Sequence, residues 1–163
     1  MGKPLLCLLW VACLCAGCFK KENDCAARNI TAPDPEVKLV AEYLAGHNIP
    51  ATRHQSGLYY RTITEGSGRS PAICSSIKVN FSGTLPNGTR FEGDNGVALN
   101  LRMMLESWRI ALPLMKEGGR VILYVPPTLG YGSTGKQDKD TGAEIVAPDA
   151  PIIIYDITFL SIN

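Results

Sequence analysis

The sequence has little histidine, the side chain that enzymes use most often for proton transfer. Histidine occurs only twice, as His47 and His54, and both lie before Gly57, where the main folded domain is expected to begin. No acidic pair, and no nucleophile with a base at a suitable spacing, stands out in the rest of the chain. Each histidine is better explained as a solvated or hydrogen-bonded side chain than as a general base. General acid–base and covalent catalysis are therefore not indicated.

Charge of one sign and clusters of metal ligands are also scarce. The 163 residues include 16 lysines and arginines and 15 acidic residues, which gives a net charge of +1 without any basic block. Nucleic acid is therefore not expected as a partner. Neither Cys25 nor Cys74 has a further cysteine or histidine at ligand spacing, so we expect no metal. The glycine pattern from Gly130 to Gly135 follows two prolines rather than a strand, so no dinucleotide or other cofactor is expected.

Long hydrophobic runs are missing except at the N-terminus. The uncharged run from Leu5 to Cys15 follows Lys3 and is shorter than the roughly 20 residues that a membrane-spanning helix needs. A short apolar run after a positive residue is typical of a targeting segment, which takes no part in the folded domain.

The end of this segment, Leu14-Cys15-Ala16-Gly17-Cys18, resembles the lipobox of a bacterial lipoprotein. The resemblance implies that residues 1–17 are a lipoprotein signal peptide and that Cys18 becomes the lipid-bearing N-terminus. It also implies a lipid anchor in a membrane of the bacterial cell envelope. We expect the outer membrane, with the protein on its periplasmic or surface-exposed side. An ordinary secretory signal with coincidental cysteines is the alternative.

Only two cysteines remain in the body of the chain once the signal and its acceptor are set aside. In an oxidising compartment such as the periplasm, Cys25 and Cys74 could form a disulfide. Two separate free thiols are the alternative. A disulfide would require the two Cα atoms to lie within about 7 Å of each other.

The segment between the signal and the main domain changes from irregular to helical. Residues 18–33 are polar and without a pattern, which predicts a flexible tether. Asp34 as N-cap, Pro35 at the first helical position and apolar residues every three or four positions predict a helix that ends near Gly46. This helix dominates an N-terminal helical segment over 34–56, and we expect it to pack on the domain. A dimerisation arm is the alternative.

After this segment the hydrophobic period changes to two, which is typical of strands. Strands are expected over 58–64, 77–82, 89–92, 97–101, 120–125 and 152–162, with a turn at 86–88 and one short helix over 106–112 that Pro113 ends. This pattern predicts an antiparallel α+β domain over 57–163, with a β-sheet wrapped around a short α-helix. The stretch 128–151 has no period, and we expect its charged middle, 135–142, to be mobile.

An ordered set of motifs lies between Val79 and Gly132. The motifs are Val79-Asn80-Phe81-Ser82-Gly83, Asn87-Gly88-Thr89-Arg90-Phe91-Glu92, Met104-Leu105-Glu106-Ser107-Trp108, Leu114-Met115-Lys116-Glu117-Gly118-Gly119 and Leu129-Gly130-Tyr131-Gly132. In this order and at these intervals, residues 57–162 resemble the FKBP-type peptidyl-prolyl cis-trans isomerases, the macrolide-binding immunophilins. The resemblance implies an FKBP-like fold, proline-containing polypeptide clients among folding envelope proteins, and macrolides as possible inhibitors.

The implied reaction needs little besides apolar and aromatic residues. Rotation about an X-Pro bond breaks no bond, and amide resonance sets its barrier at about 18–20 kcal/mol. A dry pocket that binds the twisted amide better than the planar one lowers this barrier.

The resemblance also assigns the residues of the pocket. Trp108 matches the floor under the prolyl ring, the backbone N–H of Leu105 holds a substrate carbonyl, and the Tyr131 hydroxyl is a second donor. The full implied set is Phe81, Phe91, Glu92, Leu105, Trp108, Tyr131 and Tyr155. Ile154 is an alternative to Tyr155, because the last strand is one residue longer than the family pattern.

Several residues depart from the family pattern. Phe81 stands where tyrosine is usual, Glu92 where aspartate is usual and Leu99 where phenylalanine is common. These departures predict a wider and softer pocket, which weakens the case for high catalytic efficiency and tight macrolide binding. The alternatives to an isomerase are a prolyl-peptide binding module and an envelope chaperone or assembly subunit. It also remains open whether the aromatic residues are simply core.

Overall fold

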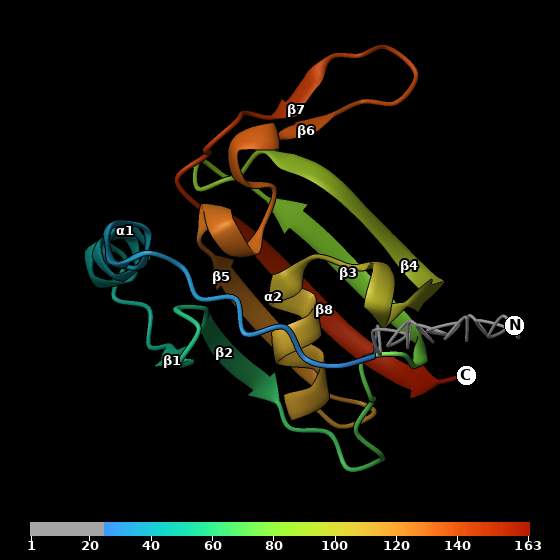
Figure 1. Ribbon diagram of the computed structural model, residues 1–163. Helices are drawn as coiled ribbons and strands as arrows, with labels where there is room; N and C mark the ends of the chain where they lie inside the picture. Colours follow the sequence, from blue (N-terminus) through green and yellow to red (C-terminus); the bar gives the residue numbers. More distant parts are fainter. Residues whose placement is uncertain (1–24) are drawn as a thin grey trace, which may run out of the picture.

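The structure is a computed structural model that describes residues 25–163, and its largest element is a six-stranded antiparallel sheet (Figure 1). The strand order is β1-β2-β5-β8-β3-β4. The strands are β1 (Thr52–Arg53), β2 (Tyr59–Thr64), β3 (Ser76–Thr84), β4 (Arg90–Asn100), β5 (Arg120–Val125) and β8 (Ile153–Ile162). The helices are α1 (Asp34–Gly46) and α2 (Glu106–Ala111), and the 3-10 turns are η1 (Leu101–Met103), η2 (Leu112–Leu114), η3 (Pro127–Leu129) and η4 (Gly132–Thr134). The α+β prediction is confirmed.

The main core lies between the sheet and α2. Alternate residues of the central strands are buried on the side that faces the helix, among them Val79 on β3, Leu123 on β5 and Phe159 on β8. α2 contributes Trp108 and Ala111 to the same cluster. The helix ends one residue earlier than predicted, and the chain continues as η2, whose second residue is Pro113. Proline is compatible with that position because the first turn of a helix does not use its N–H groups.

One long strand replaces the two that were expected after the turn at 86–88. β4 runs without interruption from Arg90 to Asn100, and its pairing with β3 shifts register between Val79 and Phe81. At this bulge the backbone N–H of Gly96, with φ +65°, donates to Oδ1 of Asn80 at 2.7 Å. A bulge interrupts the alternation of apolar and polar residues within one strand, and this interruption suggested two strands.

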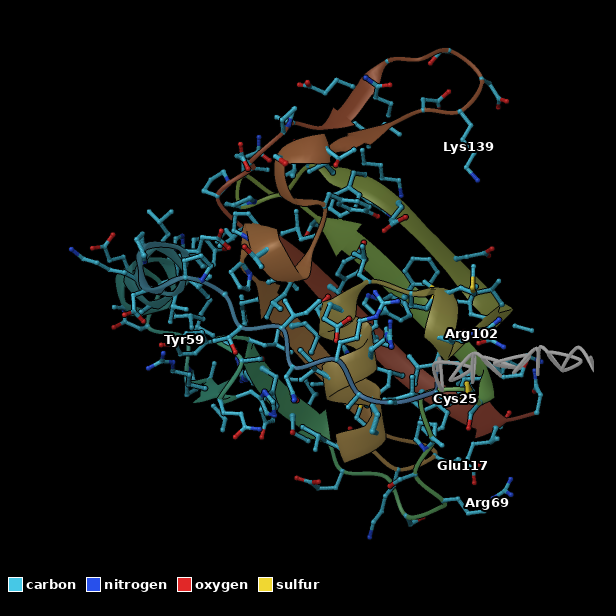
Figure 2. All side chains as sticks on the ribbon, viewed as in Figure 1. Cys25, Tyr59, Arg69, Arg102, Glu117 and Lys139 are labelled. Atoms are coloured by element: carbon cyan, nitrogen blue, oxygen red, sulfur yellow. A yellow bond between two sulfur atoms is a disulfide. The ribbon has the colours of Figure 1, made fainter. Side chains whose placement is uncertain are left out.

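Glu117 fastens the bend at Gly118–Gly119 to two distant segments. Its carboxylate accepts hydrogen bonds from the N–H of Arg69 at 3.2 Å and the N–H of Ile162 at 2.8 Å. Figure 2 shows Glu117 and Arg69 side by side at this end of the sheet. These backbone hydrogen bonds lower the pKa of Glu117 below its usual range.

α1 packs on the sheet, as expected. Val40 and Leu44 form a second apolar cluster with Tyr124 on β5. The Glu36 carboxylate also accepts hydrogen bonds from the N–H and the hydroxyl of Thr128, at 2.8 and 2.7 Å. The N-cap is Pro33 rather than Asp34, and it makes no side-chain capping bond, so the expected capping residue lies inside the first turn.

Residues 25–33, called the strap below, have no helix or strand but are fastened to the domain. Of the two states left open for the cysteines, the structure has the disulfide: Cys25 and Cys74 are joined, with Cα atoms 5.2 Å apart (Figure 2). At the other end of the strap, the N–H of Ala32 donates to the carbonyl of Ser56 at 2.8 Å, and Ala32 is buried. The strap passes over α2 on the side away from the sheet (Figure 1).

The predictions for residues 1–24 fall outside the described residues. These are the signal peptide over 1–17, the lipidated Cys18 and the first part of the tether. Within the described part of the chain, no helix combines the length and hydropathy that crossing a membrane requires.

The stretch 128–151, which had no period, contains a small hairpin. β6 (Lys136–Gln137) pairs with β7 (Glu144–Val146), with Lys136 opposite Val146. Strands of two and three residues are too short to produce an alternating pattern, which explains why the sequence did not predict them.

Candidate active site

The aromatic residues assigned to the pocket gather around Trp108. The indole contacts Phe81 and Tyr155 edge-to-face, with ring centroids 5.1 and 5.3 Å apart. Phe91 meets Tyr155 at 5.8 Å and Tyr131 at 6.2 Å, again at steep angles. Edge-to-face contacts of this kind stabilise aromatic clusters. The structure therefore brings together residues from β3, β4, α2, β8 and the loop before η4.

Gly83 allows two of these rings to approach the sheet. A Cβ at this position would lie 2.6 Å from Phe91 and 3.0 Å from Tyr155, closer than side chains approach. Gly83 also pairs with Tyr155 in the β3–β8 ladder. Sequence reasoning did not single out this residue, although a glycine inside a strand often marks such a close approach.

Tyr155, and not Ile154, belongs to this cluster. Along β8, Tyr155 is buried in the core that includes α2, whereas Ile154 packs against the cluster around α1. Successive residues of a strand point to opposite faces of the sheet, so only one of the two can line the site.

A polar group lies at the edge of the aromatic cluster, centred on the carboxylate of Glu92. Tyr131 donates to its Oε1 at 2.9 Å, and Tyr155 donates to the same oxygen. The two tyrosine hydroxyls lie 3.1 Å apart. Phe81 on β3 has no hydroxyl and cannot bond this carboxylate. Tyr155 on β8 donates the hydrogen bond instead.

Lys136 completes the polar group and was missed by the sequence analysis. Its Nζ forms an ion pair with Oε2 of Glu92 and lies 5.7 and 5.3 Å from the ring centroids of Phe91 and Tyr131. The two partners are 44 positions apart in the sequence, so no spacing links them. The only signal was a charged residue directly after the glycine-rich loop.

The pKa shifts keep these groups in fixed protonation states around neutral pH. Burial raises the pKa of Tyr155 and of Tyr131, so both hydroxyls remain protonated donors. Burial alone would lower the pKa of Lys136, but its hydrogen bonds with Glu92 and Tyr131 outweigh that effect and raise it. Lys136 therefore stays charged.

Leu105 presents the backbone donor that was assigned to it. It is the N-cap of α2, so its carbonyl accepts from the N–H of Trp108 at 3.0 Å while its own N–H is not used by the helix. No hydrogen bond among the described residues employs this N–H.

Trp108 itself is 1% exposed in the free chain. Phe81, Phe91, Leu105 and Tyr131 around it are half-buried. The indole is therefore covered by its neighbours in the free chain.

An antiparallel sheet packed on one short helix, with an aromatic cluster around Trp108, is the arrangement that the resemblance to the FKBP-type family implies. The sequence matches the family described as FKBP-type peptidyl-prolyl cis-trans isomerase over residues 68–160. This is more than half of the chain, and the chain belongs to this family.

Curated relatives carry the same family name or a related one. A "Probable FKBP-type peptidyl-prolyl cis-trans isomerase" of Haemophilus influenzae is 32% identical over 130 residues, which cover 77% of this chain and 50% of the relative. The "Macrophage infectivity potentiator" of Trypanosoma cruzi is 35% identical over 118 residues, covering 69% and 57%. The chain thus spans about half the length of these relatives.

Solved structures show the same fold. FkpA from Escherichia coli superposes with a TM-score of 0.66 at 23% identity, covering 79% of this chain and 60% of that one. A peptidyl-prolyl cis-trans isomerase from Pseudomonas syringae pv. tomato has a TM-score of 0.66 at 22% identity, covering 81% and 97%.

Proposed function

We propose that the protein is a peptidyl-prolyl cis-trans isomerase that acts on X-Pro bonds of polypeptide clients. The observation that carries this proposal is the aromatic cluster around Trp108, beside the unused N–H of Leu105. The indole receives the prolyl ring, and Phe81 and Phe91 form the walls. Water excluded from such a pocket cannot solvate the planar, more dipolar amide, so the twisted amide is favoured there.

The polar group orients the substrate rather than exchanging protons with it. In the free chain both tyrosine hydroxyls donate to Glu92. Because one carboxylate oxygen accepts from both, Tyr131 can turn toward a substrate carbonyl while Tyr155 continues to satisfy Glu92. Rotation about the amide then requires neither a covalent intermediate nor a proton transfer.

A protease-coupled assay with a prolyl peptide tests this proposal on the purified chain. We expect the chain to accelerate cis-to-trans conversion in proportion to its concentration. The second candidate, a prolyl-peptide binding module, is favoured by the covered indole and the occupied hydroxyls. Saturable peptide binding without acceleration would select that module and contradict the isomerase. An envelope chaperone or assembly subunit would act through other surfaces, and its function would survive loss of Trp108.

We further propose that the chain is lipid-anchored in the bacterial cell envelope, with folding envelope proteins as clients and macrolides as possible inhibitors. The proposed organisation is a signal peptide over 1–17, a tether over 18–33 whose part from Cys25 onward is the strap fastened to the domain, a helical segment over 34–56 and the isomerase domain over 57–163. The sequence around Cys18 supports the anchor, since two or more acyl chains give stable membrane attachment. Cys18→Ala should abolish incorporation of labelled fatty acid, and labelling that persists in this variant would contradict the anchor.

A further inference from the structure

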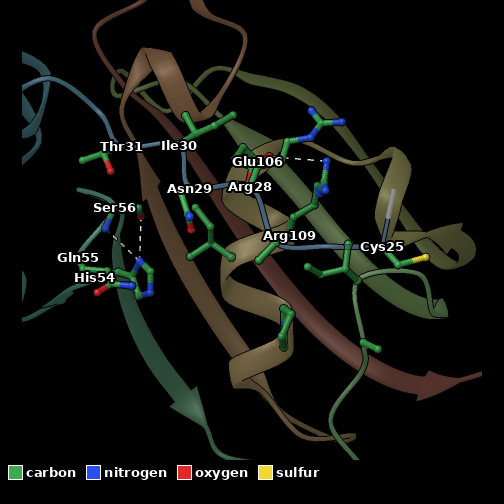
Figure 3. A pocket seen from close by; sticks show the side chains of 15 residues that line it. Cys25, Arg28, Asn29, Ile30, Thr31, His54, Gln55, Ser56, Glu106 and Arg109 are labelled. Atoms are coloured by element: carbon green, nitrogen blue, oxygen red, sulfur yellow. Dashed lines mark hydrogen bonds and ion pairs between the residues drawn. The ribbon is translucent and has the colours of Figure 1, made fainter. Parts of the chain in front are cut away.

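A cavity of about 700 Å³ lies between α2 and the strap (Figure 3). Its walls come from Cys25 and residues 27–31 of the strap, the segment 54–56, residues 72–73, and the outer face of α2 with Pro113. This volume falls within the roughly 300–1,000 Å³ that is usual for small-molecule sites. None of the residues proposed for the isomerase pocket lines it, so the two sites are separate.

Arg109 lines this cavity and has hydrogen-bonding capacity that the protein does not use. Its side chain is 3% exposed, and its Nη1 lies 3.7 Å from Oε2 of Glu106, beyond hydrogen-bond distance. Nη2 donates to the carbonyl of Ala26 at the long distance of 3.4 Å. Nε has no partner among the described residues. A buried guanidinium with five donors and such weak partners has room for a further acceptor.

Two residues next to Arg109 also bury a polar atom, but they do not line the cavity. Ser107 Oγ and Trp108 Nε1 are also buried without a partner in the described part of the chain. Only Arg109 of these three residues lines the cavity. Arg109 is therefore the one of the three that belongs to the wall of the cavity, and its Nε, itself buried, becomes available to a ligand when the side chain turns toward the cavity.

The charge of the cavity favours an anion with an apolar body. Among the described residues that line the cavity, Arg28 and Arg109 are accompanied by one carboxylate, that of Glu106, which leaves an excess of one positive charge within this set. Much of the remaining wall is apolar and includes Ile30 and Ile110. The planar fork of arginine matches a carboxylate in a bidentate manner.

We propose that this cavity is a second binding site, for a ligand that carries a carboxylate on an apolar body. The carboxylate meets Arg109, and the apolar body lies along the isoleucines of α2 and the strap. A free organic acid and the C-terminal residue of a peptide share this chemistry. Because the Cys25–Cys74 disulfide fastens the strap that forms one wall, the site is complete in the oxidised chain.

Titration of the full-length chain with matched acids and amides tests the proposal. The probes are hexanoate for a free acid and acetyl-leucyl-leucine for a peptide C-terminus, each compared with its own amide. We expect at least one acid to bind about tenfold or more tightly than its amide, because a hydrogen bond from a charged group is worth at least that factor. The acid that binds identifies the source. Equal affinity of acids and amides, or no saturable binding of either acid, overturns the proposal.

A cavity-filling variant locates the binding without removing Arg109, whose loss would also disturb the fold. Ile110→Trp places an indole inside the cavity and should abolish binding of the acid. Leu114→Trp is the matched control, since Leu114 is 56% exposed on η2 and does not line the cavity. Joint replacement of Cys25 and Cys74 by serine should weaken binding by releasing the strap. Full affinity in folded Ile110→Trp protein would contradict the assignment.

Discussion

The face of α2 toward the sheet, called the inner face, and the face toward the strap, called the outer face, bury different kinds of side chain. On the inner face, the neutral Trp108 packs against aromatic rings at 5.1 and 5.3 Å, and its Nε1 is buried without a partner among the described residues. On the outer face, Arg109 is almost as deeply buried but is held by one distant carboxylate and one long hydrogen bond. Burial of a charge in this way is unfavourable unless partners compensate for it.

Under the two proposals made above, one short helix serves two sites with different chemistry. The proposed inner site selects by shape, because its ligand would be a ring and a twisted amide. The proposed outer site selects by charge, because its unused group is a cation. If the comparison is correct, changes to one face should leave the other unaffected.

The largest effect is expected from Trp108→Ala, which removes the floor of the inner face. Loss of this packing should cost about 3–5 kcal/mol of unfolding free energy. Loss of the contact with the prolyl ring should lower kcat/KM by about tenfold or more, equivalent to roughly 1.4 kcal/mol of transition-state binding. Urea unfolding and isomerase kinetics on the same sample measure both.

Trp108→Phe is the control for this variant, since it keeps a ring and should recover part of the activity. Binding of the acid to the outer cavity should persist in the folded Trp108→Ala protein. Wild-type turnover in that protein would place the chemistry elsewhere.

The second largest effect is expected from releasing the strap, and it should be confined to the outer face. Replacing both Cys25 and Cys74 by serine should lower the unfolding free energy by about 2–4 kcal/mol, because the unfolded chain loses a covalent constraint. At a temperature where the variant is folded, isomerase activity should remain unchanged. Thermal unfolding with and without reductant measures the effect, and two reactive thiols in protein purified without reductant would show that the bridge is absent.

A smaller effect is expected from Lys136→Met at the edge of the inner face. The ion pair with Glu92 is partly exposed, so its contribution to the unfolding free energy should lie within about 0.2–1 kcal/mol. The pKa of Lys136 is raised above its ordinary value of 10.5. The contribution is therefore fully present below that value and is lost as the pH rises through the higher pKa of the folded chain.

Unfolding of the wild type and of Lys136→Met at neutral and at strongly alkaline pH tests the direction of this dependence. The stability difference between the two proteins should shrink at alkaline pH. A difference that stays constant would show that packing of the lysine side chain, rather than its charge, stabilises the site.

A comparably small effect, on turnover rather than on stability, is expected from Tyr131→Phe. One hydrogen bond contributes about 0.5–1.5 kcal/mol net, so kcat/KM should fall by at most roughly tenfold. Tyr43→Phe on α1, outside both sites, is the matched control and should have no effect on turnover. A loss much larger than that from Trp108→Ala would show that the hydroxyl, and not the aromatic floor, dominates catalysis.

The sequence predicted those parts of the fold that have a strong period. α1, β2, β3, β5 and β8 all lie within a residue or two of their expected positions, because alternation or helical spacing extends over enough residues to be recognised. The bulge at Asn80 was not predictable, since it depends on a hydrogen bond across the sheet to Gly96. The hairpin of β6 and β7 was missed because its strands are too short for a period.

The site was predictable only in part, for a related physical reason. The resemblance identified the aromatic residues, and the structure gathers them. Lys136 and Gly83 were missed because their importance arises from contacts with residues distant in sequence, Glu92 in one case and Phe91 and Tyr155 in the other. Spacing along the chain carries no information about such contacts.

The central claim is that the inner face of α2 catalyses rotation without proton transfer, and the pH profile of kcat/KM tests it most directly. Tyr131, Tyr155 and Lys136 have pKa values raised above their already alkaline ordinary values, so none of them changes charge near neutral pH. A protease-free assay of the wild-type chain should therefore show clear acceleration with a flat profile from about pH 6 to 9. A bell-shaped profile in that range would require a general acid or base and would contradict the account, as would the absence of any acceleration.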